Sequence, residues 1–246
     1  MQPTLTPADT TRRAPGLTQR SAALISGGAL LVMVIAAPFA EMYAFPKLIV
    51  PYKPAETARN IIAHQGLFTG AIFAFFLTFF LDVVLSWSLY VLLRPVNEAL
   101  SLLTAWLRLT YSIIALVALN NLITVHRLLT IPDYLNVFQP EQLHAQAMLS
   151  VRAFKNHWYF GLIFFGAHLL LLAYLVYKSG YIPRIFGILL AITGLGYLLT
   201  SLRPYLMPDV NIDFAMYTFY GELAFMLWLL IRGARIREQP ADQASS

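Results

Sequence analysis

The sequence contains no cysteine and few charged side chains. Only 12% of its 246 residues are Asp, Glu, Lys or Arg, whereas 59% are apolar or aromatic. The absence of cysteine excludes disulfides, thiolate metal sites and cysteine nucleophiles. Soluble domains carry about 25% charged residues, so this chain has too few polar groups to cover a water-facing surface. The composition argues against a soluble enzyme, a disordered protein and a nucleic-acid-binding protein, and it favours an integral membrane protein.

Long apolar segments are what the sequence has instead. A membrane-crossing helix needs about 20 apolar residues, and backbone groups inside hydrocarbon must be paired within their own segment. We therefore predict an all-α fold, a polytopic transmembrane helix bundle with six spans. The predicted spans are residues 21–43, 65–93, 99–125, 157–177, 182–202 and 214–231.

The connections between these segments differ in length. Short links at 94–97 and 178–184 predict hairpins between the second and third spans and between the fourth and fifth. Pro95 and Pro183 suit the first turn of a helix, and Gly180 suits the left-handed residue that follows a helix end. Of the two longer links, 44–64 is predicted to contain a short helix near its end. The other, 126–156, contains an amphipathic stretch, 140–154, that we expect along the membrane surface.

The ends and the charge distribution predict the topology. We expect one membrane domain, residues 21–232, between disordered cytoplasmic tails at 1–20 and 233–246. Basic residues concentrate on the cytoplasmic side of membrane proteins. If both termini are cytoplasmic, nine Lys and Arg residues fall on the inner side and seven on the outer side. We therefore attribute the net charge of +5 to basic residues that orient the protein in the membrane, with both termini in the cytoplasm.

Several motifs together resemble a bacterial multi-helix membrane family known as a domain of unknown function. The resemblance extends over roughly residues 20–235, and its best segments are LLRPVN at 92–97, SGYIPR at 179–184 and ELAFMLWLLIRG at 222–233. It implies about six helices in the bacterial cytoplasmic (inner) membrane and a multi-pass topology. It implies no activity, so the chemistry must come from individual residues.

Four ionisable residues lie inside the predicted spans: Asp82, Arg108, His168 and Glu222. Each lies nine to eleven residues from the inner end of its span, or ~14–16 Å along a helix. All four are thus predicted near the middle of the bilayer. Charged groups there are costly and are candidates for function. We expect Arg108 to pair with Asp82, and His168 to be a partner for Glu222.

This intramembrane polar cluster has three interpretations. It can line a pathway for a small polar solute or protons, it can act as acid and base in an intramembrane enzyme on a lipid-like substrate, or it can only fix helix packing in a structural or assembly protein. Catalytic residues are not assigned. We expect no metal, because Arg108 would repel a cation, and no cofactor. The expected partners are the lipid bilayer and a small polar solute or proton, without nucleic acid.

Other polar or small residues have simpler interpretations. Asn120 and Asn121 are expected to hydrogen-bond between helices, and His64 and His157 to lie near the outer surface. They are secondary polar candidates. Small residues are expected to form close-packing helix surfaces; they are Gly66, Gly70, Gly187, Ala191 and Gly194.

Overall fold

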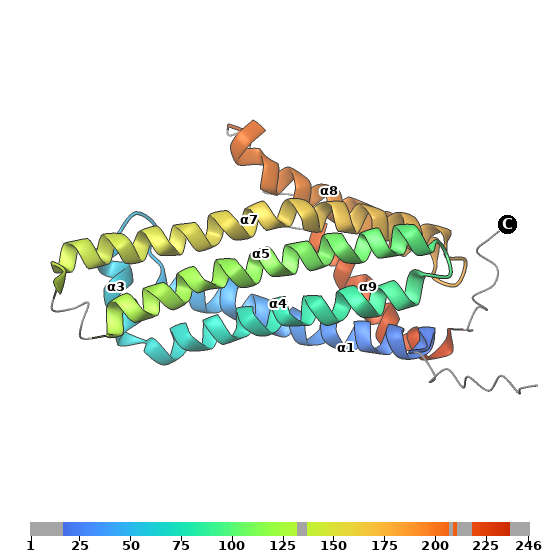
Figure 1. Ribbon diagram of the computed structural model, residues 1–246, viewed down its shortest axis with the longest axis horizontal. Coiled ribbons are helices and arrows are strands. Elements are labelled where there is room, and N and C mark those ends of the chain that lie inside the picture. The colour runs from blue at the N-terminus through green and yellow to red at the C-terminus, as the bar shows by residue number, and fades with distance from the viewer. Residues whose placement is uncertain (1–16, 132–136, 207–208, 211–217, 237–246) are drawn as a thin grey trace, which may run out of the picture.

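The structure, a computed structural model, describes residues 17–131, 137–206, 209–210 and 218–236. Within these ranges the chain is helical and contains no strand, as Figure 1 shows. In the part of the chain that the structure describes, five helices are long and apolar enough to cross a membrane. They are Gln19–Leu48, Gln65–Leu93, Glu98–Thr130, Pro140–Lys178 and Arg184–Leu206.

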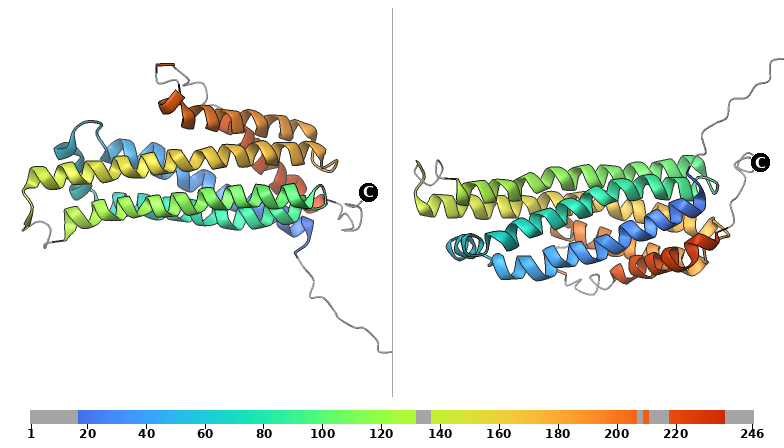
Figure 2. Two further views of the ribbon diagram at one scale, coloured as in Figure 1. Left: turned by 45° about the horizontal axis from the view of Figure 1, so that its top comes forward. Right: turned by 90° about the horizontal axis from the view of Figure 1, so that it is seen from below.

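The long helices pack side by side in chain order and form a closed ring. In sequence they are α1 (Gln19–Pro38), α4 (Gln65–Leu93), α5 (Glu98–Thr130), α7 (Pro140–Lys178), α8 (Arg184–Leu206) and the shorter α9 (Tyr220–Arg232). Each contacts the next, and α9 closes the ring against α1 (Figure 2). Residues on the inner faces of distant segments therefore share one interior.

The first helix continues past two prolines. It runs through the π-helix η1 (Phe39–Ala44) into α2 (Phe45–Leu48), and so extends beyond the predicted end at residue 43. Pro38 and Pro46 lack the backbone N–H that would pair within the helix. The π-helix lies between them, and such wider turns are a known accommodation within helices, often near functional sites.

The predicted surface helix at 140–154 is wrong. This stretch is the first part of α7, which runs without interruption from Pro140 to Lys178 (Figure 1). The apolar face of this stretch is buried and consists of Leu143, Ala147, Val151 and Phe154. α7 contacts α3 (Pro54–Ala63) and α5. This face therefore packs against protein, as part of one continuous helix.

The helix boundaries at both chain ends also differ from the prediction. α1 begins at Gln19, where Thr18 accepts a hydrogen bond from the backbone N–H of Ser21. At the other end the 3₁₀ turn η3 (Gly233–Arg235) packs on α1, and Ile236 is buried. Residues 1–16 and 237–246 of the predicted tails lie outside the described residues, as do residues 214–217 of the predicted sixth span.

Close helix packing involves part of the predicted set of small residues. A methyl group added to Gly187 would lie 2.8 Å from the carbonyl oxygen of Ala173, and one on Gly194 would lie 3.0 Å from that of Gly166. These two glycines confirm the expected contact between α7 and α8. Nothing lies within 4 Å of a methyl group on Gly66, and one on Gly70 would make an ordinary contact 3.8 Å from Phe39, so the predicted pair is not a close-packing surface.

Candidate functional site

Arg108 lies at the centre of the site and joins two neighbouring helices. Its Nε and one terminal nitrogen donate to the same oxygen of Asp82, Oδ1, at 2.9 and 2.5 Å. Both side chains are only 1% exposed. The predicted pairing of α4 with α5 through these residues is therefore present, although the two donors converge on one carboxylate oxygen.

His168 adds the third helix, α7, to this pair. Its Nε2 lies 3.0 Å from the other terminal nitrogen of Arg108, and its Nδ1 lies 2.8 Å from the backbone oxygen of Thr104. A guanidinium only donates, so Nε2 must accept, and the ring is a neutral imidazole with its proton on Nδ1. We call Asp82, Arg108 and His168 the buried triad. Its charges sum to zero.

Aromatic rings enclose the buried triad on one side. The guanidinium carbon of Arg108 lies 5.0 Å from the centre of the Phe165 ring, a cation–π distance. Phe165 also contacts Tyr111 and Tyr197, with ring centres 4.8 and 5.0 Å apart. The Tyr111 hydroxyl accepts a hydrogen bond from Trp158 Nε1 at 3.1 Å. The buried triad is therefore surrounded by protein on α5, α7 and α8.

Glu222 belongs to the same interior but not to the triad. It lies in the first turn of α9 and is half-buried. Its carboxyl group neighbours the Tyr197 hydroxyl and lies within the electrostatic influence of Arg108 and Asp82. Both ring nitrogens of His168 are used by Arg108 and Thr104, so the expected pairing of His168 with Glu222 is wrong. Glu222 is the acid of this cluster that has a phenol, not a guanidinium, as its partner.

The local sequence explains why these polar groups face inward. Small hydroxyl residues accompany them on the buried faces of α4 and α5. Ser86 donates to the backbone oxygen of Ala105 at 2.6 Å, and Ser112 donates to that of Arg108 at 2.8 Å. These bonds satisfy the two hydroxyl groups within the bundle.

The secondary polar candidates lie apart from the triad. Asn121 on α5 lies 3.3 Å from His157 Nδ1 on α7, so it bridges two helices as expected. Asn120 is exposed, and exposed His64 contacts the backbone oxygen of Asn60 at 3.1 Å. The structure brings none of these residues into contact with Asp82, Arg108 or His168.

Glu41 and Lys155 form an ion pair that the sequence pattern does not predict. Glu41 lies in η1 and Lys155 on α7, and their side chains are 31% and 25% exposed. The ammonium group also lies 4.9 Å from the Phe45 ring centre. Lys155 was expected in a loop, so only the continuity of α7 reveals its position beside the π-helix. The presence of a glutamate at the end of an apolar run was the available signal.

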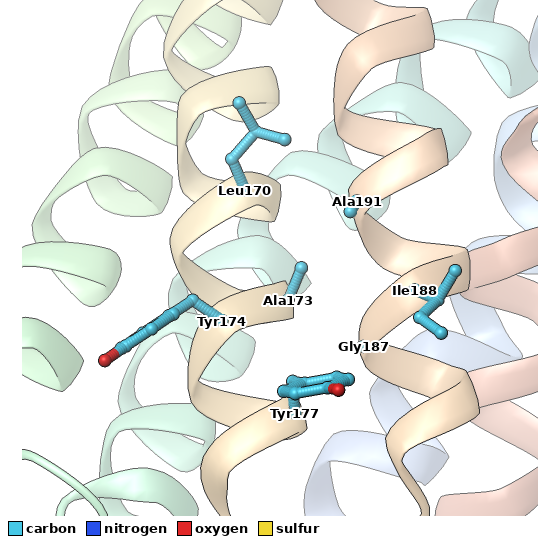
Figure 3. A pocket seen from close by; sticks show the side chains of 7 residues that line it. All are labelled: Leu170, Ala173, Tyr174, Tyr177, Gly187, Ile188 and Ala191. Atoms are coloured by element: carbon cyan, nitrogen blue, oxygen red, sulfur yellow. The ribbon is translucent and has the colours of Figure 1, made fainter.

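Two depressions lie away from the buried triad. Figure 3 shows the first, about 270 Å³ between α7 and α8, lined largely by apolar side chains and including Leu170, Tyr177 and Ile188. The second, about 470 Å³, is lined by Tyr181, Trp228 and two arginines. Neither is lined by a residue of the triad or by Glu222.

The fold and the site together define an all-helical protein whose long apolar helices enclose a paired polar centre. The chain belongs to the family described as Domain of unknown function (DUF4386), whose model matches residues 25–233. This membership confirms the resemblance in the sequence, and the matched range contains all four polar residues of the interior.

A relative from Archaeoglobus fulgidus, described as an "Uncharacterized protein", is 34% identical over 168 residues. The match covers 68% of this chain and 86% of the relative. No solved structure matches the chain.

Proposed function

We propose that this chain is a multi-pass protein of the bacterial cytoplasmic membrane that carries a small-solute or proton-linked pathway, with Glu222 as its exchanging group. In this proposal α9 belongs to a sixth span, α4–α5 and α7–α8 are hairpins, and both termini are cytoplasmic. The small excess of basic residues on that side supports the orientation.

The observation that carries the proposal is the different environment of the two acids. Asp82 is 1% exposed and accepts two hydrogen bonds from Arg108. Glu222 is half-buried, and its polar neighbour is the Tyr197 hydroxyl. A carboxyl group can exchange its proton with a pathway only if it is accessible and is not held by a permanent cation. Glu222 meets both conditions better than Asp82.

The buried triad supplies a fixed framework for this group. Arg108 stays protonated in proteins, and its charge acts on Glu222. Asp82 and His168 hold the guanidinium in place from α4 and α7. The positive charge near Glu222 would therefore stay fixed while the carboxyl group gains or loses a proton.

A purely structural role is the second candidate, and one observation favours it. The three side chains of the triad are buried and hydrogen-bonded to one another, as expected of groups that fix helix positions. The enzyme alternative rested on a dyad of His168 and Glu222. Because His168 uses both nitrogens elsewhere, the geometry gives that dyad no support.

The test combines a deletion strain with proton measurements. The strain is profiled for lipids and small solutes and is complemented with wild type, Glu222→Gln, Tyr197→Phe or Glu141→Gln. Glu141→Gln removes an exposed carboxylate from the first turn of α7 and is the matched control. Purified proteins in vesicles with an internal pH dye then report proton entry, with each solute that accumulates in or disappears from the deletion strain added outside.

We expect wild type and Glu141→Gln to restore the profile and to admit protons faster than empty vesicles. Glu222→Gln should fail in both assays, and Tyr197→Phe should be intermediate because it removes only the hydroxyl partner. Full rescue by Glu222→Gln, with proton entry equal to wild type, would contradict the proposal and leave the structural role.

A further inference from the structure

A second polar site lies at the end of the bundle where α9 finishes. The depression of about 470 Å³ there is lined by Tyr181, Pro183, Trp228, Arg232, Arg235 and Ile236. The depression is shallow and open to the surface of the bundle. It lies between the α7–α8 turn and the continuous end of α9 and η3, so two separate segments contribute to it.

The walls of this depression are fixed by contacts with neighbouring helices. The Tyr181 hydroxyl donates to the backbone oxygen of Leu92 at 2.6 Å, which holds the turn on the end of α4. Trp228 lies 5.7 Å from Phe186 between ring centres. A methyl group added to Gly233 would lie 3.0 Å from Ala23 on α1, so η3 is pressed against that helix.

The two arginines give the site a positive charge. Arg232 and Arg235 are both exposed, and no ion pair involves either of them within the described part of the chain. The adjoining turn adds Lys178 before it and Arg184 after it. Two accessible guanidinium groups beside one depression favour a doubly hydrogen-bonded anion such as phosphate, because their planar forks match phosphate oxygens.

The position of the depression along the bundle indicates which kind of molecule carries the phosphate. α4 and α7 end near this depression, and α8 begins there. Trp228 lies one helical turn before Arg232 on the same face of α9. Tryptophan and tyrosine next to arginine mark the level of lipid headgroups, and basic pockets between helices at that level bind anionic headgroups.

We infer that this depression binds the phosphate-bearing headgroup of an anionic phospholipid. The arginines hold the phosphate, and the rings of Trp228 and Tyr181 lie beside the glycerol region. A zwitterionic lipid carries its own ammonium group and so presents no net negative charge to the arginines. The inference is independent of Glu222, because the two sites share no lining residue.

The experiment measures lipid binding to the full-length protein in detergent by native mass spectrometry. The probes are phosphatidylglycerol, phosphatidylcholine and inorganic phosphate. The variant is Arg232→Gln with Arg235→Gln. The matched control is Arg59→Gln with Arg127→Gln, which removes two exposed arginines from α3 and from the last turn of α5. Far-UV circular dichroism and size-exclusion elution show that each protein is folded.

We expect wild type and the control to retain phosphatidylglycerol in preference to phosphatidylcholine. The Arg232 and Arg235 double variant should bind phosphatidylglycerol about tenfold more weakly, since it loses the charged hydrogen bonds to phosphate. Unchanged binding in this folded variant, or equal retention of the two lipids by wild type, would overturn the inference. Displacement of the lipid by millimolar inorganic phosphate would show a free-anion site and would overturn the lipid assignment.

Discussion

Arg108 donates two hydrogen bonds to a single oxygen of Asp82, with Nε and a terminal nitrogen at 2.9 and 2.5 Å. This arrangement leaves the other terminal nitrogen directed to His168, 3.0 Å away. One guanidinium therefore connects α4, α5 and α7. The connection has consequences for stability that are separate from any transport role.

Removing one charge of the Asp82–Arg108 pair should lower the stability of the protein more than removing both charges. Asp82→Asn or Arg108→Met leaves a buried partner without its counter-charge, which costs about 3–5 kcal/mol, whereas a double apolar replacement is often close to neutral. We therefore expect both single variants to melt well below wild type in detergent. The combination Asp82→Leu with Arg108→Met should recover most of the loss. Single variants as stable as wild type would show that the pair does not hold these helices.

The glycines at the α8–α9 and α7–α8 contacts should not tolerate a methyl group. A methyl group on Gly221 would lie 2.6 Å from the carbonyl oxygen of Leu189, and one on Gly187 would lie 2.8 Å from that of Ala173. Backbone cannot move aside as a flexible side chain can, so each alanine should destabilise by about 1–3 kcal/mol.

Gly28 provides the control, because nothing lies within 4 Å of its added methyl group. Gly28→Ala should leave the melting temperature unchanged or raise it slightly, since alanine favours helix. Thermal unfolding of the three variants compares these outcomes directly. Equal behaviour of Gly28→Ala and Gly221→Ala would mean that α8 and α9 are not in close contact.

Because of Tyr181, the free energy of unfolding should decrease with rising pH in the alkaline range. Burial raises the pKa of its hydroxyl above the usual value, against an opposing hydrogen bond with Gln19. The neutral phenol therefore stabilises the fold fully below the unfolded pKa of about 10, and this contribution is lost as the pH rises further. Tyr181→Phe removes the bond to Leu92 and should cost about 1 kcal/mol near neutral pH.

The difference between wild type and Tyr181→Phe should then shrink above pH ~10. Unfolding of both proteins across neutral and alkaline buffers measures it. A gap that is constant with pH would show that the hydroxyl is not buried in the folded protein. A gap of zero at every pH would show that its hydrogen bond to Leu92 does not contribute to stability.

The sequence was sufficient to place the polar residues at similar heights but not to pair all of them. A rise per residue gives the position of a side chain along its helix, and on this basis Arg108 was correctly paired with Asp82 on the next helix. It does not give the rotation of each helix about its axis. For that reason the expected pairing of His168 with Glu222 failed, since His168 faces Arg108 and Thr104.

The prediction of a separate surface helix at 140–154 was wrong for a related reason. The stretch 140–154 has one apolar face, and an amphipathic pattern does not tell whether lipid or protein covers it. The structure shows protein, with Phe154 6.0 Å from Phe45 between ring centres. The same continuity brought Lys155 beside Glu41, a pair that no local pattern linked because 114 residues separate the two side chains.

The central claim is that Glu222 exchanges its proton while the buried triad stays fixed. Infrared difference spectroscopy of the protein in a lipid film tests this directly, because protonated carboxyl groups have their own carbonyl band. When the buffer pH is changed between about 6 and 9, a range in which ordinary carboxyl groups stay ionised, wild type and Asp82→Asn should show this band with a shift in heavy water, and Glu222→Gln should lack it. A band that persists unchanged in Glu222→Gln, or that disappears in folded Asp82→Asn, would contradict the account.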